Sequence, residues 1–211
     1  MVETTATAAL APRAPEELRT SPAALLADRF AAAEVTGPRG VSVREIPFRT
    51  MIGIRVLPSS PGAARLRSRL DVTLPAACGE VEQRDGLAVL WLSPDEFLVV
   101  GEEDPSTLTA GLVDALAGAA GSVTDLSANR TCFELSGPSA RPVLEKGCPL
   151  DLHPRAFAVG TAFLTTIGPV PVIVWKTGEL TYQIFPRSSF ADFLGRWLLD
   201  AMAEFAAPEL P

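Results

Sequence analysis

Hydrophobic and polar residues alternate in the first part of the chain and give way to continuous hydrophobic runs further on. Residues 41–46 alternate apolar and polar side chains, which is the pattern of a half-buried strand, and a second strand is expected over residues 51–56. Two continuous apolar runs follow at residues 87–92 and 97–100, and the polar segment 93–96 between them is typical of a tight turn. The pattern therefore predicts short strands connected by turns.

Other parts of the chain carry hydrophobic residues at helical spacing. Leu108, Leu112, Val113 and Leu116 fall on one face of a helix predicted over residues 106–119, with Gly121 marking its end. Three further helices are expected where a serine or proline precedes the pattern, over residues 23–33, about 139–146 and 189–206. Residues 64–70 are expected to form a short helix or another turn.

Strands are predicted again in the second half of the chain. Two of them span residues 122–126 and 130–135. A three-stranded meander follows over residues 161–167, 170–175 and 180–185, with turns at 168–169 and 176–179. Strands and helices mixed in this order favour an α+β fold of mixed, largely antiparallel sheets with flanking helices over a doubly wound parallel sheet.

The predicted elements define one folded unit behind an unstructured start. Residues 1–20 consist mainly of Ala, Thr, Pro and Glu without a hydrophobic period, so we expect a disordered N-terminal lead-in. Residues 21–211 form the predicted α+β domain, either undivided or split into two sub-lobes near residue 80.

Charge and cysteine content narrow the range of partners and compartments. The formal net charge is −7 and the pI is about 4.8, whereas phosphate binding needs concentrated Lys and Arg, so nucleic acid is not an expected partner. Three widely spaced cysteines favour a reducing compartment. The apolar run 110–121 is too short to cross a bilayer, and Glu3 stands where a signal peptide would carry positive charge. We therefore expect a cytoplasmic protein without a membrane partner.

A search for reactive groups finds little that is typical of an enzyme. The chain contains no G-x-G and no P-loop, so it is not expected to bind FAD by the common dinucleotide route. His153, the only histidine, could act as a general base or, with Cys148 nearby, as a metal ligand. A loop histidine is the favoured interpretation, because a zinc site needs more ligands than this spacing supplies. No catalytic, cofactor-binding or metal-binding residue is predicted.

Four charged residues are the candidates for contacts with a ligand or a partner chain: Asp95, Asp125, Arg130 and Arg187. Asp95 and Glu96 are adjacent in a turn, and the favoured interpretation is that Asp95 caps the turn while Glu96 is solvated. The guanidinium of Arg130 suits a carboxylate on a ligand or on the protein, and the favoured interpretation is an ion pair with Asp125 that orders the connection between the two residues. Arg187 could bind a ligand, stabilise a helix start or touch a partner, and the sequence does not separate these roles.

Several short motifs in a fixed order resemble one known family. They are Val43-Arg-Glu-Ile-Pro-Phe48, Trp91-Leu-Ser-Pro-Asp-Glu-Phe-Leu98, Asp125-Leu-Ser127, Asn129-Arg-Thr131, Leu135-Ser-Gly-Pro138, Lys146-Gly-Cys-Pro-Leu-Asp-Leu-His-Pro-Arg-Ala-Phe157 and Pro186-Arg-Ser188. Each is weak by itself, but together they resemble the gamma subunit of heterotetrameric sarcosine oxidase.

The resemblance implies both a fold and membership of a multi-subunit complex. The gamma fold is related to a shortened folate-binding aminomethyltransferase domain, and the subunit carries no catalytic residue. Its partners are the alpha, beta and delta subunits, chiefly alpha. FAD, NAD and covalent FMN belong to alpha and beta, and zinc belongs to delta. The complex oxidises sarcosine to glycine and releases hydrogen peroxide with formaldehyde, or with methylene-tetrahydrofolate when folate is present. The alternative from a different class is a stand-alone folate-binding, aminomethyltransferase-like protein that would hold its ligand with Asp95, Asp125 or Arg130.

Overall fold

Two five-stranded antiparallel sheets form the centre of the molecule, as a computed structural model describes it for residues 19–207. The strands of the first sheet, in spatial order, are β1 (Ser42–Ile46), β7 (Cys132–Ser136), β10 (Thr181–Pro186), β9 (Val170–Gly178) and β8 (Ala162–Ile167). The strands of the second sheet are β3 (Val81–Arg84), β4 (Leu87–Ser93), β5 (Glu96–Gly101), β2 (Thr50–Arg55) and β6 (Ser122–Asp125). The predicted α+β class with antiparallel sheets is confirmed.

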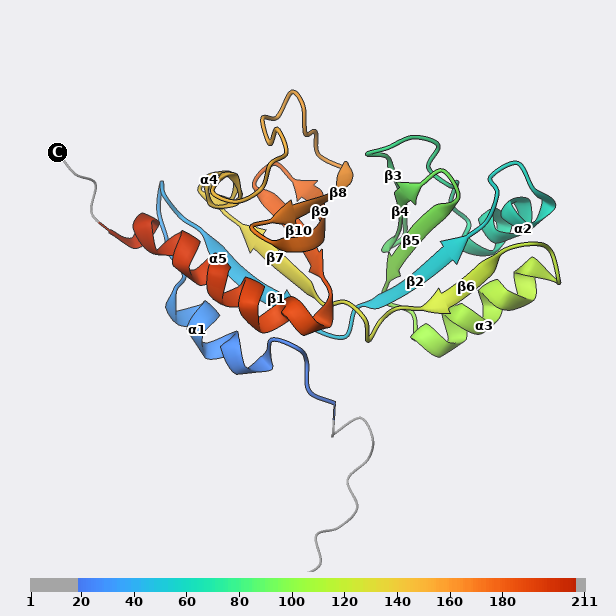
Figure 1. Ribbon diagram of the computed structural model, residues 1–211, viewed down its shortest axis with the longest axis horizontal. Coiled ribbons are helices and arrows are strands. Elements are labelled where there is room, and N and C mark those ends of the chain that lie inside the picture. The colour runs from blue at the N-terminus through green and yellow to red at the C-terminus, as the bar shows by residue number, and fades with distance from the viewer. Residues whose placement is uncertain (1–18, 208–211) are drawn as a thin grey trace, which may run out of the picture.

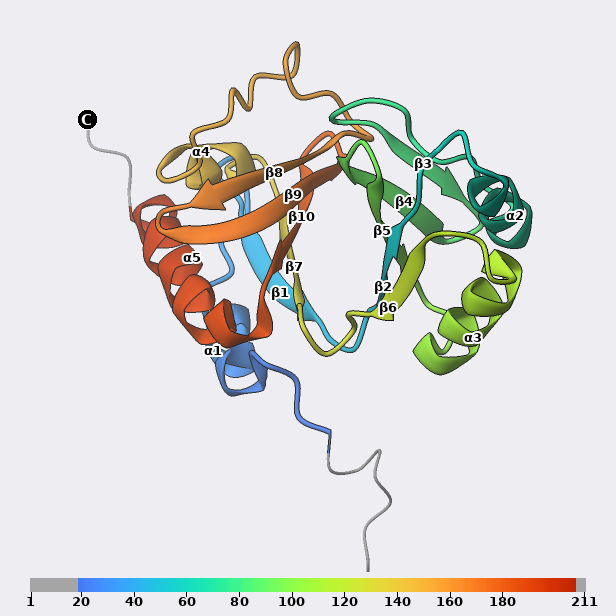
Figure 2. The same ribbon diagram turned by 45° about the vertical axis from the view of Figure 1, so that its right-hand side comes forward.

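Helices cover the outer face of each sheet, as Figures 1 and 2 show. The first sheet is covered by α1 (Ala27–Ala32), α4 (Ala140–Glu145) and α5 (Ala191–Ala206), with short 3-10 turns before α1 and α5 at Ala24–Leu26 and Ser188–Phe190. The second sheet is covered by α2 (Pro61–Leu70) and α3 (Pro105–Leu116). The layers are therefore helix, sheet, sheet, helix.

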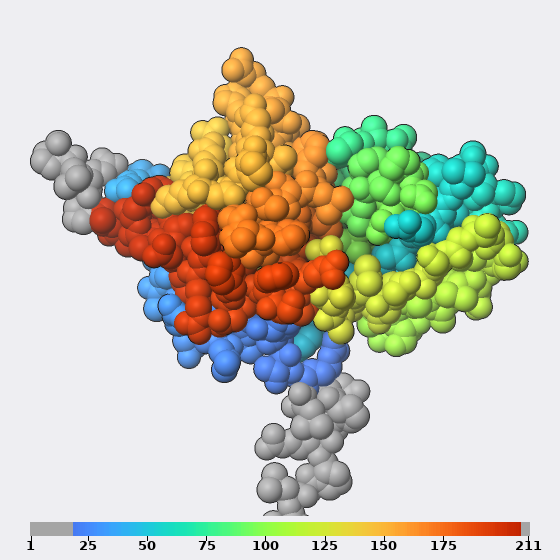
Figure 3. Space-filling model, viewed as in Figure 1, coloured from blue at the N-terminus to red at the C-terminus, as the bar shows by residue number. Residues whose placement is uncertain are grey.

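Hydrophobic side chains fill all three spaces between these layers. One cluster lies between the first sheet and its helices, and a second lies between the second sheet and α2 and α3. The third cluster, called the central core below, joins the two sheets. Its buried members are Met51, Ala88, Leu90, Leu98, Val100, Cys132, Ala162, Ile173, Trp175 and Phe185. Figure 3 shows the two halves of the molecule in direct contact.

Most predicted elements are confirmed, and three expectations were wrong in detail. The helix expected to run to residue 119 ends at Leu116, because Ala117 and Gly118 adopt positive φ angles of 47° and 76°. The turn expected over residues 176–179 is shorter, since β9 continues to Gly178. The strand expected from residue 130 begins at Cys132, although Arg130 still forms an isolated bridge with Arg187.

The sequence pattern missed β3 and left one helix undecided. Three of the four residues of β3 are polar, and the strand lies at the edge of its sheet where two of them are exposed, so no hydrophobic alternation marks it. The segment left open as a helix or a turn is α2, which starts at Pro61 behind a Ser60 cap.

Two expectations concern the organisation of the chain as a whole. The disordered lead-in expected over residues 1–20 falls, up to residue 18, outside the described residues. The division into sub-lobes near residue 80 stays a prediction. Within residues 19–207, none of the helices has the length and apolar character needed to cross a membrane.

Candidate functional site

Arg130 and Arg187 extend the ladder between β7 and β10, where an isolated antiparallel bridge places them opposite each other. Side chains alternate between the faces of a strand, so each arginine shares a face with the residue two positions away. Those residues are Cys132 and Phe185, which belong to the central core. Both arginines are therefore on the face that the first sheet turns toward the second sheet.

The two arginines line the same open hollow, which has a volume of about 710 Å³ and is called the arginine hollow below. Its other lining residues come from β8, β9 and the 3-10 turn before α5: Leu164, Thr165, Thr166, Pro171, Val172 and Phe190. The backbone holds the base of the hollow in place, because Thr131 N–H donates to Pro186 O (3.2 Å) and Ser188 N–H donates to Asn129 O (2.8 Å).

Positive charge in the arginine hollow is only partly compensated. Arg130 Nη1 donates to the carbonyl oxygen of Phe185 at 2.9 Å. Burial and the nearby positive charge of Arg187 lower the pKa of Arg130, while the negative charge of Glu96 on the second sheet raises it. Glu96 itself forms an ion pair with Arg55 at 2.6 Å. Among residues 19–207, no carboxylate lies at ion-pair distance from Arg130 or Arg187.

The other two candidates, Asp95 and Asp125, are bound within their own turns. Asp95 Oδ1 accepts a hydrogen bond from Ser93 Oγ at 3.0 Å, and Asp125 Oδ1 accepts one from Ser127 N–H at 2.9 Å. These are the local roles that short acidic side chains favour in turns. The structure thus brings Arg130 and Arg187 together, and neither aspartate lines the arginine hollow.

Two pairing expectations need correction. Arg130 is held by the Phe185 carbonyl and Asp125 by the Ser127 amide, so the Asp125–Arg130 ion pair that was the favoured interpretation does not form. Glu96 is not simply solvated, because its carboxylate pairs with Arg55 on the neighbouring strand β2.

Neither His153 nor Cys132, which could in principle supply acid–base or nucleophilic chemistry, lines the arginine hollow. His153 is exposed in the loop between α4 and β8, at the top of Figure 1, where its Nδ1 accepts the N–H of Arg155 at 3.2 Å. Cys132 is buried in the central core, and burial raises the pKa of its thiol to about 12. Within the described part of the chain, no group of three or more His, Cys, Asp or Glu residues is placed to hold a metal ion.

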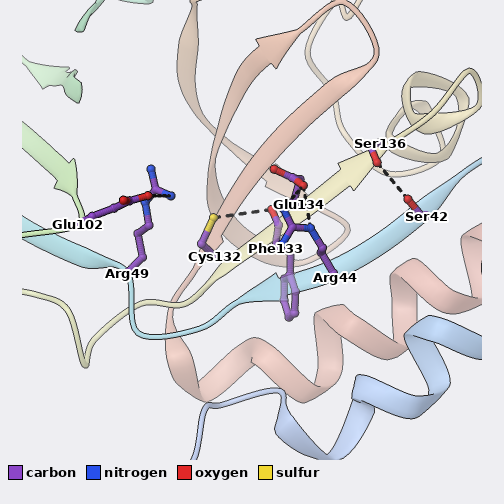
Figure 4. Close-up of polar contacts among 8 residues, drawn as sticks. All are labelled: Ser42, Arg44, Arg49, Glu102, Cys132, Phe133, Glu134 and Ser136. Carbon is purple, nitrogen blue, oxygen red and sulfur yellow. Dashed lines mark hydrogen bonds and ion pairs between the residues drawn. The ribbon is translucent and has the colours of Figure 1, made fainter. Parts of the chain in front are cut away.

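Polar side chains also pair with each other across β1 and β7. Figure 4 shows Arg44 paired with Glu134 and Ser42 with Ser136. The Arg44–Glu134 contact measures 2.6 Å and the two serine hydroxyls are 3.0 Å apart. Arg49, which precedes β2, reaches Glu102 at 3.8 Å. These charged side chains are paired with each other within the chain. We therefore assign the pairs a structural role in holding neighbouring strands together.

Sequence reasoning identified the two arginines but not the residues that complete the hollow. Leu164, Thr166 and Pro171 join it only because β8 pairs with β9 in one register. Phe190 falls within the helix expected over residues 189–206, but it lies in the 3-10 turn ahead of α5 and is 38% exposed. No local signal in the sequence gives either the strand register or the direction of this aromatic ring.

Comparison with known proteins gives a consistent result. The model of the sarcosine oxidase, gamma subunit family matches residues 58–204. The sarcosine oxidase subunit gamma of Corynebacterium sp. (strain U-96) is 50% identical over 195 residues, which are 92% of this chain and 95% of that protein. The protein of the same name from Arthrobacter sp is 50% identical over 192 residues, or 90% and 93% of the two chains.

Solved structures agree with the sequence comparisons. A chain of the heterotetrameric sarcosine oxidase from Corynebacterium sp. U-96, in complex with pyrrole 2-carboxylate, matches with a TM-score of 0.89 and 50% identity over 92% of this chain and 100% of that chain. Glycine cleavage system aminomethyltransferase T from Bartonella henselae matches with a TM-score of 0.57 over 82% of this chain and 48% of that chain. At 16% identity, the second match shows a shared fold only.

Proposed function

Because the chain belongs to the sarcosine oxidase gamma subunit family, we propose that it is the small, non-catalytic subunit of a heterotetrameric sarcosine oxidase. The observation that carries this proposal is the 50% identity to a gamma subunit along 95% of that protein's length. The match to a whole chain of a heterotetrameric sarcosine oxidase, with a TM-score of 0.89, supports it further.

The reaction assigned to the complex is the oxidative demethylation of sarcosine. Sarcosine, oxygen and water give glycine, formaldehyde and hydrogen peroxide: two electrons and two protons pass from the C–N bond of sarcosine to oxygen, and water hydrolyses the resulting imine. With tetrahydrofolate, the methyl carbon leaves as methylene-tetrahydrofolate instead. The cofactors assigned to the partner subunits are FAD, NAD and FMN in alpha and beta, and zinc in delta.

The side chains of this subunit support a role without chemistry. His153, which would be the natural general base, is exposed in a loop and accepts a backbone hydrogen bond through Nδ1. The thiol of Cys132 has a pKa of about 12, so it stays protonated at neutral pH and cannot act as a nucleophile. Asp95 and Asp125 accept hydrogen bonds within their turns.

The proposed partners are the alpha, beta and delta subunits of the same complex, with alpha as the main contact, and the proposed compartment is the cytoplasm. The chain would then contribute surfaces that hold the assembly together. It would contribute neither a cofactor pocket nor an acid–base pair.

Co-purification tests the proposal. An affinity-tagged copy of the chain, recovered from its native lysate, is expected to bring down larger flavin-bearing chains that release peroxide when sarcosine is added. The same chain expressed alone is expected to be colourless after gel filtration. A colourless monomer from the native lysate that binds a reduced folate in calorimetry would contradict the subunit role and support the stand-alone folate-binding alternative.

A further inference from the structure

We propose that the arginine hollow is a docking site for an acidic segment of a partner subunit, with a carboxylate of that segment bound between Arg130 and Arg187. This inference rests on the proposed function, because it requires the chain to be part of an assembly. It assigns a surface and a chemical complement that the family relationship does not supply.

The first argument is the repulsion between the two arginines, which the described residues compensate only in part, through the charge of Glu96 near Arg130. Residues directly opposite in an antiparallel ladder have Cβ atoms about 4.5–5.5 Å apart, and like charges at such positions are destabilising. Arg130 and Arg187 occupy such a pair, and the described residues offer neither of them a carboxylate at ion-pair distance. Elsewhere on the same sheet, Arg44 is opposite Glu134 and pairs with it at 2.6 Å. A carboxylate from a partner chain would neutralise the charge of Arg130 and Arg187 as Glu134 neutralises that of Arg44.

The second argument is that Arg130 is held ready for an anion. Its Nη1 atom is fixed on the Phe185 carbonyl, which leaves the other guanidinium nitrogens for a ligand. Burial already lowers its pKa, so part of the desolvation that binding requires has occurred in the free subunit. Arginine is the side chain best suited to carboxylates because its planar fork donates two parallel hydrogen bonds.

The third argument concerns the size and character of the occupant. The arginine hollow is open, and its rim includes Leu164 and Phe190, which are 52% and 38% exposed. Arginine and aromatic residues beside apolar surface are the composition enriched at protein–protein interfaces. A peptide segment that carries an acidic residue next to an apolar one would complement both features, whereas a small carboxylate alone would leave the rim uncovered.

Charge reversal in the complete complex is the first test. Arg187 is exposed, so Arg187→Glu is expected to fold, and a matched control is Arg155→Glu on the exposed loop between α4 and β8. Retention of the subunit by the co-expressed alpha, beta and delta chains is measured by native mass spectrometry over a dilution series. Arg187→Glu is expected to raise the dissociation constant by about tenfold or more, as loss of a buried interfacial charge pair does, and Arg155→Glu to leave it unchanged.

Cross-linking identifies the complement directly. Arg187→Lys keeps the positive charge and supplies an amine that a carbodiimide can couple to a neighbouring carboxylate. We expect a cross-linked peptide that joins position 187 to an aspartate or glutamate of a partner subunit. The cross-link should be absent from the wild-type complex, because arginine does not form the amide under these conditions.

The outcomes separate this inference from the function it rests on. If the wild-type chain is retained by the complex and Arg187→Glu is retained equally well, the docking site is wrong and the subunit role stands. If glutarate, used as a small carboxylate probe, stabilises the wild-type complex but not Arg187→Glu while assembly is unaffected, the hollow binds small carboxylates and the docking site is again wrong. If the wild-type chain is not retained at all, the proposed function itself fails.

Discussion

At the scale of single residues, the reactivity of the cysteines tests whether the space between the two sheets is closed to solvent. Cys132 is buried with a thiol pKa of about 12, whereas Cys78 is exposed. Only the thiolate reacts with alkylating reagents, so iodoacetamide at mildly alkaline pH is expected to label Cys78 in the folded chain and Cys132 only after unfolding. Peptide mass spectrometry measures both rates. Equal labelling rates for Cys78 and Cys132 in the folded chain would contradict the burial of Cys132 in the central core.

Gly137 shows why the connection from β7 to α4 requires glycine. Its φ angle is 114°, and an added Cβ would overlap the carbonyl oxygen of Gly40. The neighbouring atoms are backbone and cannot rotate away, so Gly137→Ala is expected to lower the free energy of unfolding by about 2 kcal/mol or more.

Gly101 supplies the control for this substitution. A Cβ at that position meets nothing within 4 Å, and its φ angle is not in the left-handed region. Gly101→Ala is therefore expected to change the free energy of unfolding by less than about 0.5 kcal/mol. Urea unfolding of both variants measures the difference. Equal effects of the two substitutions would show that the close approach of Gly40 does not exclude a Cβ at position 137.

At the scale of elements, α2 and α3 begin with similar caps that should respond differently to pH. Ala63 N–H donates to Ser60 Oγ at 3.2 Å, and Thr107 N–H donates to Asp104 Oδ1 at 2.9 Å. The hydrogen bond from Thr107 is the main cause that lowers the pKa of Asp104 from 3.8. A lowered carboxylate pKa stabilises the fold above the unfolded value, and this stabilisation is lost as the pH falls below it.

Two alanine variants distinguish these caps. Asp104→Ala is expected to lower the melting temperature at neutral pH, and the difference from wild type should shrink as the pH falls below 3.8. Ser60→Ala should cost about 1 kcal/mol at either pH, because its hydroxyl does not titrate. Thermal melts across this pH range provide the measurement. If the melting temperature of Asp104→Ala remains below that of wild type by the same amount in acid, the claim that the Asp104 carboxylate caps α3 is contradicted.

The elements also show how far the sequence determines the fold. Helices α3 and α5 and strands β1, β4 and β5 follow from capping residues, hydrophobic spacing and apolar runs, all of which are local signals. The edge strand β3 is polar, so no hydrophobic pattern marks it. Helix α3 ends at Ala117, which adopts a left-handed conformation although it is not a glycine, so the residue type does not mark this helix end. The arginine hollow depends on the pairing of β7 with β10 and of β8 with β9. Such pairings join distant segments, so the sequence supplied both arginines but not the site they form.

At the scale of the whole molecule, the two sheets place reactive side chains and contact surfaces in different positions. The central core occupies the space between the sheets and buries the Cys132 thiol. His153 is exposed on the loop between α4 and β8. The arginine hollow opens at the surface, with two arginines and exposed apolar side chains at its rim. This arrangement suits a subunit that binds other chains.

Turnover of the assembled complex carrying His153→Ala decides whether this chain takes part in the chemistry. His153 is the only histidine of the chain, and histidine is the most common general acid–base residue. Sarcosine-dependent peroxide release per bound flavin is measured for the wild-type and variant complexes, with assembly checked by native mass spectrometry. We predict equal rates. A loss of about 10²-fold or more in the intact complex, the size expected for removal of a general acid or base, would contradict the non-catalytic role.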